Sequence, residues 1–196
     1  MTDPGLPRAR RPGGRSARVR ADVHAAVEAL QSEHPLGEIT MARIAERSGV
    51  HLGTLYRRWG SLDGVLLDVV SERLTARSPV PDTGDYANDL REYARQAAED
   101  LAGPEGVLLL RTLVSVQLDD GRSLPPALSR RFDDLQDMLD RAAHRGETVP
   151  TSEEVFELVI APLCASLLFG TEPPDVHRLV ERVDLVAAHE ADTRGE

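Results

Sequence analysis

Apolar and polar positions recur along this chain with the period of an α-helix. A first apolar stripe runs through Val23, Val27 and Leu30, and Pro35 ends it. Two short apolar segments follow on either side of Gly49, and further stripes continue through the rest of the chain. No segment shows the period-two alternation, bounded by turn residues, that predicts a β-strand. The pattern therefore predicts an all-α protein with about nine helices.

Three regions differ in composition and pattern. Residues 1–15 are rich in Pro, Gly and Arg and lack an apolar period, which predicts a disordered, arginine-rich arm. Residues 16–78 read as a small domain of short helices, whose boundary we place inside or just after the fourth helix, before Pro79. Residues 79–196 continue as longer helices and are expected to form a second domain. Within it we expect Val107–Leu118, which is apolar on nearly every side, to be a central buried helix.

The net charge of −10 is distributed unevenly. Residues 1–60 hold 10 Arg and 6 acidic residues, a balance of +4, whereas residues 61–196 hold 13 Arg and 27 acidic residues, a balance of −14. A basic end on an acidic body indicates contact with a polyanion at that end, and a solvated tail of random sign is the alternative. All 23 basic residues are Arg, so every cationic contact uses a guanidinium group.

Composition also argues against several classes of protein. The apolar run Leu158–Ala165 is too short to cross a bilayer, and the N-terminus lacks the apolar segment of a secretory signal. Cys164 stands alone, so no disulfide framework is expected. We therefore expect a cytoplasmic protein that makes no membrane contact. Because no phosphate loop, metal-ligand spacing or catalytic Ser-His-Asp context is found, we expect no enzymatic activity, metal site or cofactor.

The segment Thr40–Trp59, TMARIAERSGVHLGTLYRRW, has the spacing of a helix-turn-helix. Thr40 is a good N-cap for the first short helix, and Gly49 breaks it at the turn. In the second helix Leu55 and Trp59 lie four residues apart and are expected to face the core, which leaves the other side chains outside. The second helix of this motif enters the major groove of DNA, so the segment predicts DNA binding. An αα-hairpin with exposed Arg is the alternative.

The outward positions of that second helix carry groups that suit a DNA groove. Gly53 and Thr54 are small enough for close approach to base edges, and a Thr hydroxyl can bond either a base or a phosphate. Tyr56, Arg57 and Arg58 can reach phosphates, which fix the register without reading the sequence. The candidate DNA-binding residues are Arg15, Arg18, Thr40, Arg43, His51, Leu52, Gly53, Thr54, Tyr56, Arg57 and Arg58.

The segment Arg18–Leu74 closely resembles the N-terminal domain of the TetR/AcrR family of transcriptional regulators. The family's run reads roughly T-x-x-x-I-A-x-x-A-G-V-[SH]-x-x-[TS]-[LV]-Y-x-[HYR]-[FW]-x-[SD]-[KR]-x-x-L. The C-terminal two-thirds resembles the family in layout only, through an apolar helix with an internal Pro162 followed by a final helix. The residues that match the run are Thr40, Ile44, Ala45, Gly49, Val50, His51, Thr54, Leu55, Tyr56, Arg58, Trp59 and Ser61.

Two positions depart from the family pattern. The family often has Lys at the position of Leu52 and usually Lys or Arg at that of Leu62, and both are apolar here. Affinity is then expected to depend more on Arg57, Arg58 and the arginines of the arm, Arg8–Arg20, which can enter a narrow minor groove. The alternative is that the arm is an ordinary solvated tail that does not contact DNA. The departures also keep a second function open, a helical ligand-carrying or protein-interaction module that has lost operator binding.

The resemblance implies a homodimeric, ligand-responsive regulator of double-stranded DNA, typically a repressor that a small apolar or amphipathic effector releases from a pseudo-palindromic operator. Segments 155–169 and 176–187 carry broad apolar stripes, which independently indicate an interface, with burial inside one subunit as the alternative. The expected interface residues are Val155, Val159, Leu163, Leu167, Val176, Leu179, Val183 and Val186.

The effector cavity is expected to be apolar with a few polar anchors. Arg111 is the odd residue in an otherwise apolar helix, and it could hold an anionic ligand, pair with a carboxylate or lie at the surface. Cys164 reads as a small core residue rather than a redox sensor. The candidate ligand-binding residues are Tyr86, Tyr93, Arg111 and Phe156.

Overall fold

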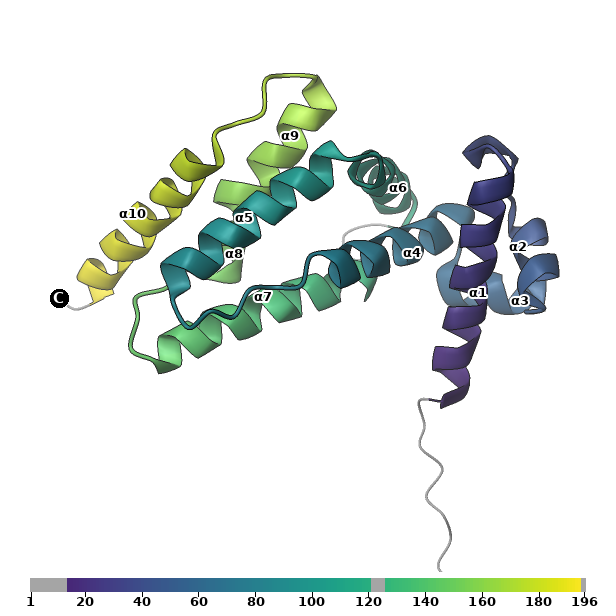
Figure 1. The fold of residues 1–196 in the computed structure, drawn as a ribbon, viewed down its shortest axis with the longest axis horizontal. Helices are drawn as coiled ribbons and strands as arrows, with labels where there is room; N and C mark the ends of the chain where they lie inside the picture. Colours follow the sequence, from purple (N-terminus) through teal and green to yellow (C-terminus); the bar gives the residue numbers. More distant parts are fainter. Residues whose placement is uncertain (1–13, 121–125, 195–196) are drawn as a thin grey trace, which may run out of the picture. The chain divides into compact units, whose positions relative to one another are not determined.

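The computed structural model describes residues 14–120 and 126–194, with side chains for residues 14–115 and 128–189. No strand occurs within these ranges, and they form nine helical segments longer than one turn when the continuous run Ser152–Phe169 is counted once (Figure 1). The expectation of an all-α fold with about nine helices is confirmed for the described residues. None of the described helices is both long enough and apolar enough to span a bilayer.

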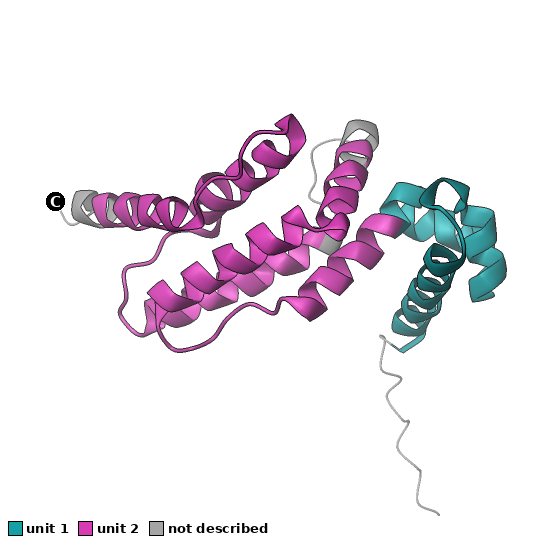
Figure 2. Ribbon diagram, turned by 45° about the horizontal axis from the view of Figure 1, so that its top comes forward, with its two compact units in different colours: residues 1–65 teal, residues 66–196 magenta. Residues whose placement is uncertain are grey.

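The chain divides into two compact units, residues 1–65 and residues 66–196 (Figure 2). The division lies inside α4 (Leu62–Arg77), and the sequence pattern placed the domain boundary inside or just after this same helix. Helix α4 therefore belongs to both units.

The first helix of unit 1 begins earlier in the chain than the sequence pattern indicated. Helix α1 starts at Gly14, so Arg15 is helical and does not belong to a disordered arm. The expected arm over residues 1–13, with Arg8, Arg10 and Arg11, lies outside the described residues. The elements of unit 1 are α1 (Gly14–Glu33), the 3₁₀ turn η1 (Leu36–Glu38), α2 (Met41–Ser48), α3 (Leu52–Trp59) and the beginning of α4.

The core of unit 1 comes from the apolar stripes that the sequence shows. Helix α2 packs against both α1 and α3, and the side chains of Val23, Val27, Ile44 and Leu55 are fully buried. Arg47 joins α2 to the end of α1 through two hydrogen bonds to Glu33, of 3.2 and 2.6 Å. This packing holds α3 in place through its buried face and leaves its opposite face exposed to solvent.

Helix α5 is the centre of unit 2, because it packs against α6, α7, α9 and α10 (Figure 1). Its buried residues include Leu90, Ala94 and Ala97, which lie on one stripe. The other elements of unit 2, besides the end of α4, are α5 (Tyr86–Ala102), α6 (Pro104–Asp120), α7 (Pro126–His144), α8 (Ser152–Val155), η2 (Phe156–Ile160), α9 (Ala161–Phe169) and α10 (Val176–Arg194).

The expectation of a central buried helix at Val107–Leu118 is wrong. In α6 the side chain of Val107 is 51% exposed, that of Val114 is 44% exposed, and Arg111 is exposed between them. Leu109 and Leu110 are buried, so one face of the helix packs and the opposite face does not. An apolar sequence does not say which helix takes the central place, and here α5 takes it.

The run Ser152–Phe169 contains one wide π-helical turn, η2. The amide of Ala161 donates to the carbonyl of Phe156, five residues earlier. Pro162 follows at once, and its ring lacks an N–H and clashes with a carbonyl four residues earlier in a regular helix. The wide turn lets the helix continue through the proline, and it lies where Phe156 and Ile160 meet the cavity described below.

Candidate nucleic-acid interface and effector cavity

One capping residue defines the start of each short helix in the helix-turn-helix. The Thr40 hydroxyl accepts a hydrogen bond from the Arg43 amide at 3.2 Å, as expected of an N-cap. His51 caps α3 in the same way, since its Nδ1 accepts from the Gly53 amide at 3.1 Å. An accepting Nδ1 carries no proton, so the neutral ring has its N–H at Nε2. The sequence reading placed His51 outside but missed this role.

The turn between the two helices depends on Gly49. Its φ is +69°, in the left-handed region that favours glycine. Gly49 is the C-cap of α2, and His51 already caps α3 two residues later. This short connection sets the angle between the helices, so the glycine determines where α3 points.

The exposed face of α3 carries most of the side chains that the sequence assigned to DNA. Leu55 is fully buried and Trp59 is half-buried, which anchors the opposite face. Tyr56 is 51% exposed, and Thr54 is half-buried with its hydroxyl 3.5 Å from Nη2 of Arg57. The exposed members of the predicted set on this helix and its cap are His51, Leu52, Gly53, Tyr56, Arg57 and Arg58.

Two of the predicted arginines also make contacts inside unit 1. Nη1 of Arg58 donates to the backbone carbonyl of Ser16 at 2.9 Å and to its hydroxyl at 2.8 Å. The same guanidinium lies over the Trp59 ring at 5.0 Å. Arg43 donates to the Glu38 carbonyl at 3.1 Å, and the Glu38 carboxylate lies 3.6 Å away. Arg58 and Arg43 therefore have fixed directions in the absence of DNA.

Arg15 and Arg18 are exposed on the first turns of α1. Arg58 contacts Ser16 on the same first turns, so the end of α3 and the start of α1 lie together. The described members of the predicted DNA-binding set therefore all lie in unit 1. They are found on α3 and its cap, at the start of α2 and on the first turns of α1.

Unit 2 contains an apolar cavity of about 110 Å³. Of the predicted ligand-binding residues, Tyr93 and Phe156 line it. Burial raises the pKa of the Tyr93 hydroxyl, and the charge of Arg131 partly opposes this shift. The lining residues are Leu74, Tyr93, Ala97, Asp100, Leu101, Leu109, Leu110, Leu113, Leu128, Arg131, Phe132, Leu135, Phe156, Ile160 and Cys164.

Tyr86 and Arg111 do not line this cavity, so their assignment to the effector site stays a prediction. The Tyr86 hydroxyl donates to Asp184 on α10 at 3.3 Å. Burial and the charge of Asp184 both raise its pKa, so it forms a neutral link between α5 and α10. Arg111 is exposed on α6, which agrees with the surface alternative.

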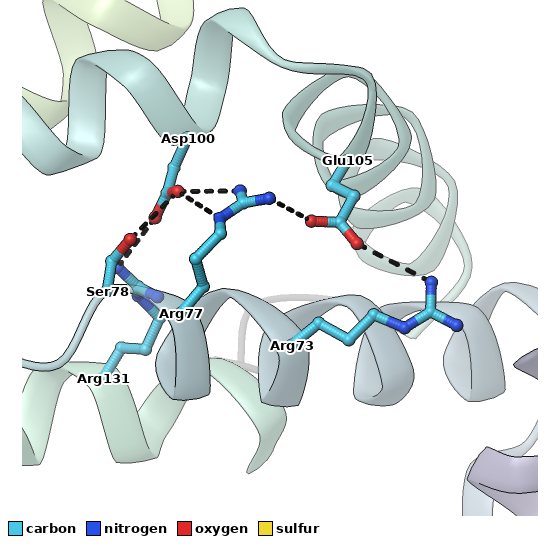
Figure 3. Close-up of polar contacts among 6 residues, drawn as sticks. All are labelled: Arg73, Arg77, Ser78, Asp100, Glu105 and Arg131. Carbon is cyan, nitrogen blue, oxygen red and sulfur yellow. Dashed lines mark hydrogen bonds and ion pairs between the residues drawn. The ribbon is translucent and has the colours of Figure 1, made fainter.

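A network of charged side chains lies beside the cavity (Figure 3). Asp100 on α5 accepts two hydrogen bonds at Oδ1 from Arg77, of 3.2 and 2.8 Å, and a third from the Ser78 hydroxyl of 3.1 Å. Arg77 also donates to Glu105 at 2.8 Å, and its bond to Asp100 raises the pKa of the guanidinium. Arg131 on α7 approaches the other oxygen of Asp100, Oδ2, to 3.9 Å.

The sequence reading missed Asp100 and Arg131. Asp100 is 5% exposed and lies on the same buried face of α5 as Tyr93 and Ala97. A carboxylate inside an apolar stripe is the signal that could have identified it. Arg131 gives no comparable signal, because it stands among charged residues of α7 and only the fold brings it to the cavity.

The predicted dimer residues are mostly core residues of a single subunit. Side chains of this kind have no surface left to give to a partner, so the prediction is wrong for the fully buried ones. These apolar stripes pack into the core of their own subunit. Burial inside one subunit was the alternative that the sequence left open. The fully buried ones are Val155, Val159, Leu163, Leu179 and Val183, while Leu167, Val176 and Val186 are half-buried.

Other apolar side chains of the last two helices are exposed. Leu168 is 56% and Phe169 80% exposed at the end of α9, and Leu185 is 71% exposed on α10. Large apolar groups with this exposure on consecutive helices are typical of an interaction surface. Among the described residues, no three His, Cys, Asp or Glu side chains lie close enough together to hold a metal ion.

Comparison with known proteins matches both units. A family model described as bacterial regulatory proteins of the tetR family matches residues 23–69, and one described as the C-terminal domain of tetracyclin repressor-like proteins matches residues 80–186. The chain is 32% identical over 151 residues to the HTH-type transcriptional regulator AqdR of Rhodococcus erythropolis, covering 75% of this chain and 72% of that protein.

Solved structures agree with this match. The TetR family transcription regulator SCO0332 is 27% identical, with a TM-score of 0.68 over 87% of this chain and 97% of that chain. The transcriptional repressor QsdR of R. erythropolis shares the fold, with 21% identity and a TM-score of 0.63 over 89% of this chain and 96% of that chain.

Proposed function

The chain belongs to the TetR family of bacterial regulatory proteins and is a ligand-responsive, DNA-binding transcriptional regulator; we propose that it acts as a repressor. In this proposal a dimer holds a pseudo-palindromic operator and releases it when a small apolar effector fills the cavity of unit 2. The observation that carries the proposal is the outer face of α3, where Tyr56, Arg57 and Arg58 are exposed above a fully buried Leu55.

In this proposal α3 lies in the major groove. Gly53 and Thr54 face base edges, because neither has a side chain long enough to hold the helix away from them. Arg57, Arg58 and Tyr56 contact phosphates and set the register. The remaining proposed contacts, to the backbone or the adjacent minor groove, come from Arg15, Arg18, Thr40, Arg43, His51 and Leu52.

We propose that the dimer forms through the exposed parts of α9 and α10. Leu168, Phe169 and Leu185 supply the apolar contact, since the fully buried residues of the same helices cannot. Two-fold symmetry then presents two copies of α3, which fit half-sites separated by about one DNA turn, roughly 34–36 Å, or somewhat more.

The proposed effector binds in the cavity of unit 2 and favours a dimer whose two α3 helices no longer match successive grooves. To move the protein from about 99% DNA-competent to about 1%, the effector must prefer the released form by roughly 5 kcal/mol. Such a preference is within reach of a ligand that buries one apolar body and satisfies a few polar groups. The proposal places the protein in the cytoplasm, where the DNA is, and includes neither a cofactor nor enzymatic activity.

One observation keeps the second function in view. Leu52, at the start of the recognition helix, is 36% exposed where relatives of the family often carry Lys. An exposed leucine supplies no phosphate contact, so a chain that had lost operator binding would tolerate it. In that case the helical body would act as a ligand carrier or a protein-interaction module.

Titration of the full chain against the intergenic DNA beside its own gene tests the proposal. The repressor predicts a discrete complex whose affinity falls steeply with salt and falls again when effector is added. A complex that forms equally well on unrelated DNA, or no complex at low salt, would instead favour the second function.

A further inference from the structure

We propose that the cavity of unit 2 selects a compact, uncharged aromatic molecule whose polar group both donates and accepts a hydrogen bond, and that Asp100 and Arg131 recognise this group. A carboxamide on a single ring has this chemistry. The inference rests on the proposed function, because it specifies the effector class that the function requires.

The two oxygens of Asp100 have different surroundings. Oδ1 accepts three hydrogen bonds, from Nε and Nη2 of Arg77 and from the Ser78 hydroxyl (Figure 3). Oδ2 is buried without a hydrogen-bond partner, on a residue that is 5% exposed and lines the cavity. One oxygen of the carboxylate is therefore fully used by the protein, and the other oxygen is buried and lacks a donor.

Arg131 supplies the complementary group. Its Nη2 lies 3.9 Å from Oδ2 of Asp100, which is too long for a hydrogen bond, and its Nη1 is buried without an acceptor. Both residues line the same cavity. Two neighbouring residues that line the cavity thus carry one unsatisfied acceptor and one unsatisfied donor, and most of the other lining residues are apolar.

The charges of this pair favour a neutral ligand. A carboxylate ligand would gain Arg131 but would place its negative charge against Asp100, and a cationic ligand would meet Arg131. Both clashes occur in a buried site, where unpaired charge is costly. A neutral group that accepts from Arg131 and donates to Asp100 satisfies both residues without adding charge.

The shape of the cavity limits the rest of the molecule. Phe132 and Phe156 line it with ring centroids 5.5 Å apart, on α7 and on the wide turn η2. Its volume of about 110 Å³ is of the same order as the roughly 150 Å³ apolar cavity that binds benzene in a well-studied engineered protein. A single ring with a small polar group is the size that this space suggests.

Calorimetric titration of the full chain with four probes of similar size tests the inference. The probes are benzamide, toluene, benzoate and benzamidinium, which differ mainly in the polar group. We expect the dissociation constant of benzamide to be lower than that of each of the other three probes by about tenfold or more. Benzamide binding no tighter than toluene, or benzoate or benzamidinium binding as tightly as benzamide, would overturn the inference.

Two substitutions sharpen the test. In Asp100→Asn the three donors at Oδ1 require the amide oxygen there, which places the amide nitrogen at the position of Oδ2. The site then offers only donors, so we expect the preference to shift from benzamide to benzoate. Arg131→Met removes the donor and should reduce benzamide affinity to the level of toluene.

Arg130→Met is the matched control, because Arg130 is exposed on the same helix, 3.8 Å from Glu72, and does not line the cavity. Circular dichroism checks that each variant is folded, and Arg131→Met decides the question if Asp100→Asn does not fold. An Arg131→Met protein that keeps the benzamide preference would contradict the inference.

DNA binding by the same preparations, measured without probe, separates this inference from the proposed function. Loss of the benzamide preference with DNA binding and toluene binding intact overturns only the ligand class. DNA binding that fails while the preference is present overturns only the repressor. If no probe binds, toluene included, the cavity is not an effector site and both ligand statements are wrong.

Discussion

Arg58 at the end of α3 and Ser16 in the first turns of α1 are joined by two hydrogen bonds from Nη1, of 2.9 Å to the carbonyl and 2.8 Å to the hydroxyl. The residues are 42 positions apart in the chain. The contact places one of the proposed phosphate-binding arginines beside the beginning of α1, which carries Arg15 and Arg18. The basic groups of unit 1 are therefore arranged before DNA arrives, which lowers the ordering cost of binding.

Arg58→Ala should weaken operator binding about tenfold and reduce the salt slope of log K by about one, because one phosphate contact is lost. Ser16→Ala should cost less, since the carbonyl of residue 16 still accepts from Arg58. Fluorescence anisotropy at several salt concentrations measures both quantities. An unchanged salt slope for Arg58→Ala would mean that the arginine serves only to hold α1.

Arg57→Ala and Thr54→Val should affect binding in different ways. Arg57 contacts phosphate in our account, so its loss should weaken binding to all sequences and lower the salt slope by about one. Thr54→Val keeps the shape and removes the hydroxyl, so it should change the preferred base at one position of each half-site while leaving the slope unchanged. Selection from a random DNA pool reads the preference directly. The same consensus for Thr54→Val and the parent chain would remove Thr54 from base recognition.

Gly49→Ala should destabilise unit 1 by about 1–2 kcal/mol, because any side chain is disfavoured at a φ of +69°. Gly37→Ala is a suitable control, since a Cβ there meets nothing within 4 Å and the φ of Gly37 is not positive. Urea unfolding followed by circular dichroism measures the difference. Equal stability of the two variants would show that the turn tolerates a side chain.

Leu185→Glu should convert the dimer to a monomer at micromolar concentration, because it places a charge in the proposed apolar interface. Val114→Glu is the comparison, since Val114 is also exposed and apolar but lies on α6. Sedimentation velocity distinguishes the two states. A dimer that persists in Leu185→Glu but not in Val114→Glu would move the interface to α6.

Cys164 should react slowly with iodoacetamide in the folded protein. It lines the cavity, and burial raises the pKa of its thiol, so the reactive thiolate is scarce at pH 8. The raised pKa also means that the contribution of the neutral thiol to stability is present below about pH 9 and is lost above it. Mass spectrometry of the alkylated protein, with and without urea, measures the protection. Equal rates in both conditions would contradict the half-buried position of Cys164.

The sequence predicts the DNA-binding unit well, because its signals are local. Thr40 and Gly49 act through their own backbone, and Leu55 belongs to a stripe that one neighbouring helix buries. Side chains on the opposite face of the helix are then necessarily exposed to solvent. The exposed face of α3 follows from these few residues without knowledge of any distant contact.

Unit 2 depends on contacts that periodicity does not contain. Val155 and Val159 lie on an apolar stripe, but the stripe does not say whether the subunit's own core or a partner covers it. Arg131 joins Asp100 from a helix 31 residues further along the chain, and only packing brings the two together. Arg111 interrupts an apolar helix at a point that proves to be solvent-exposed.

Chemical protection of guanine N7 by the full chain, on an operator selected from random DNA, shows whether α3 lies in the major groove, because N7 is exposed there. A dimer with both α3 helices in the major groove should give two patches of protected guanines about one helical turn apart, and Arg57→Ala should lose both patches at moderate salt. A stable complex that leaves every guanine N7 reactive would contradict the placement of α3 in the major groove.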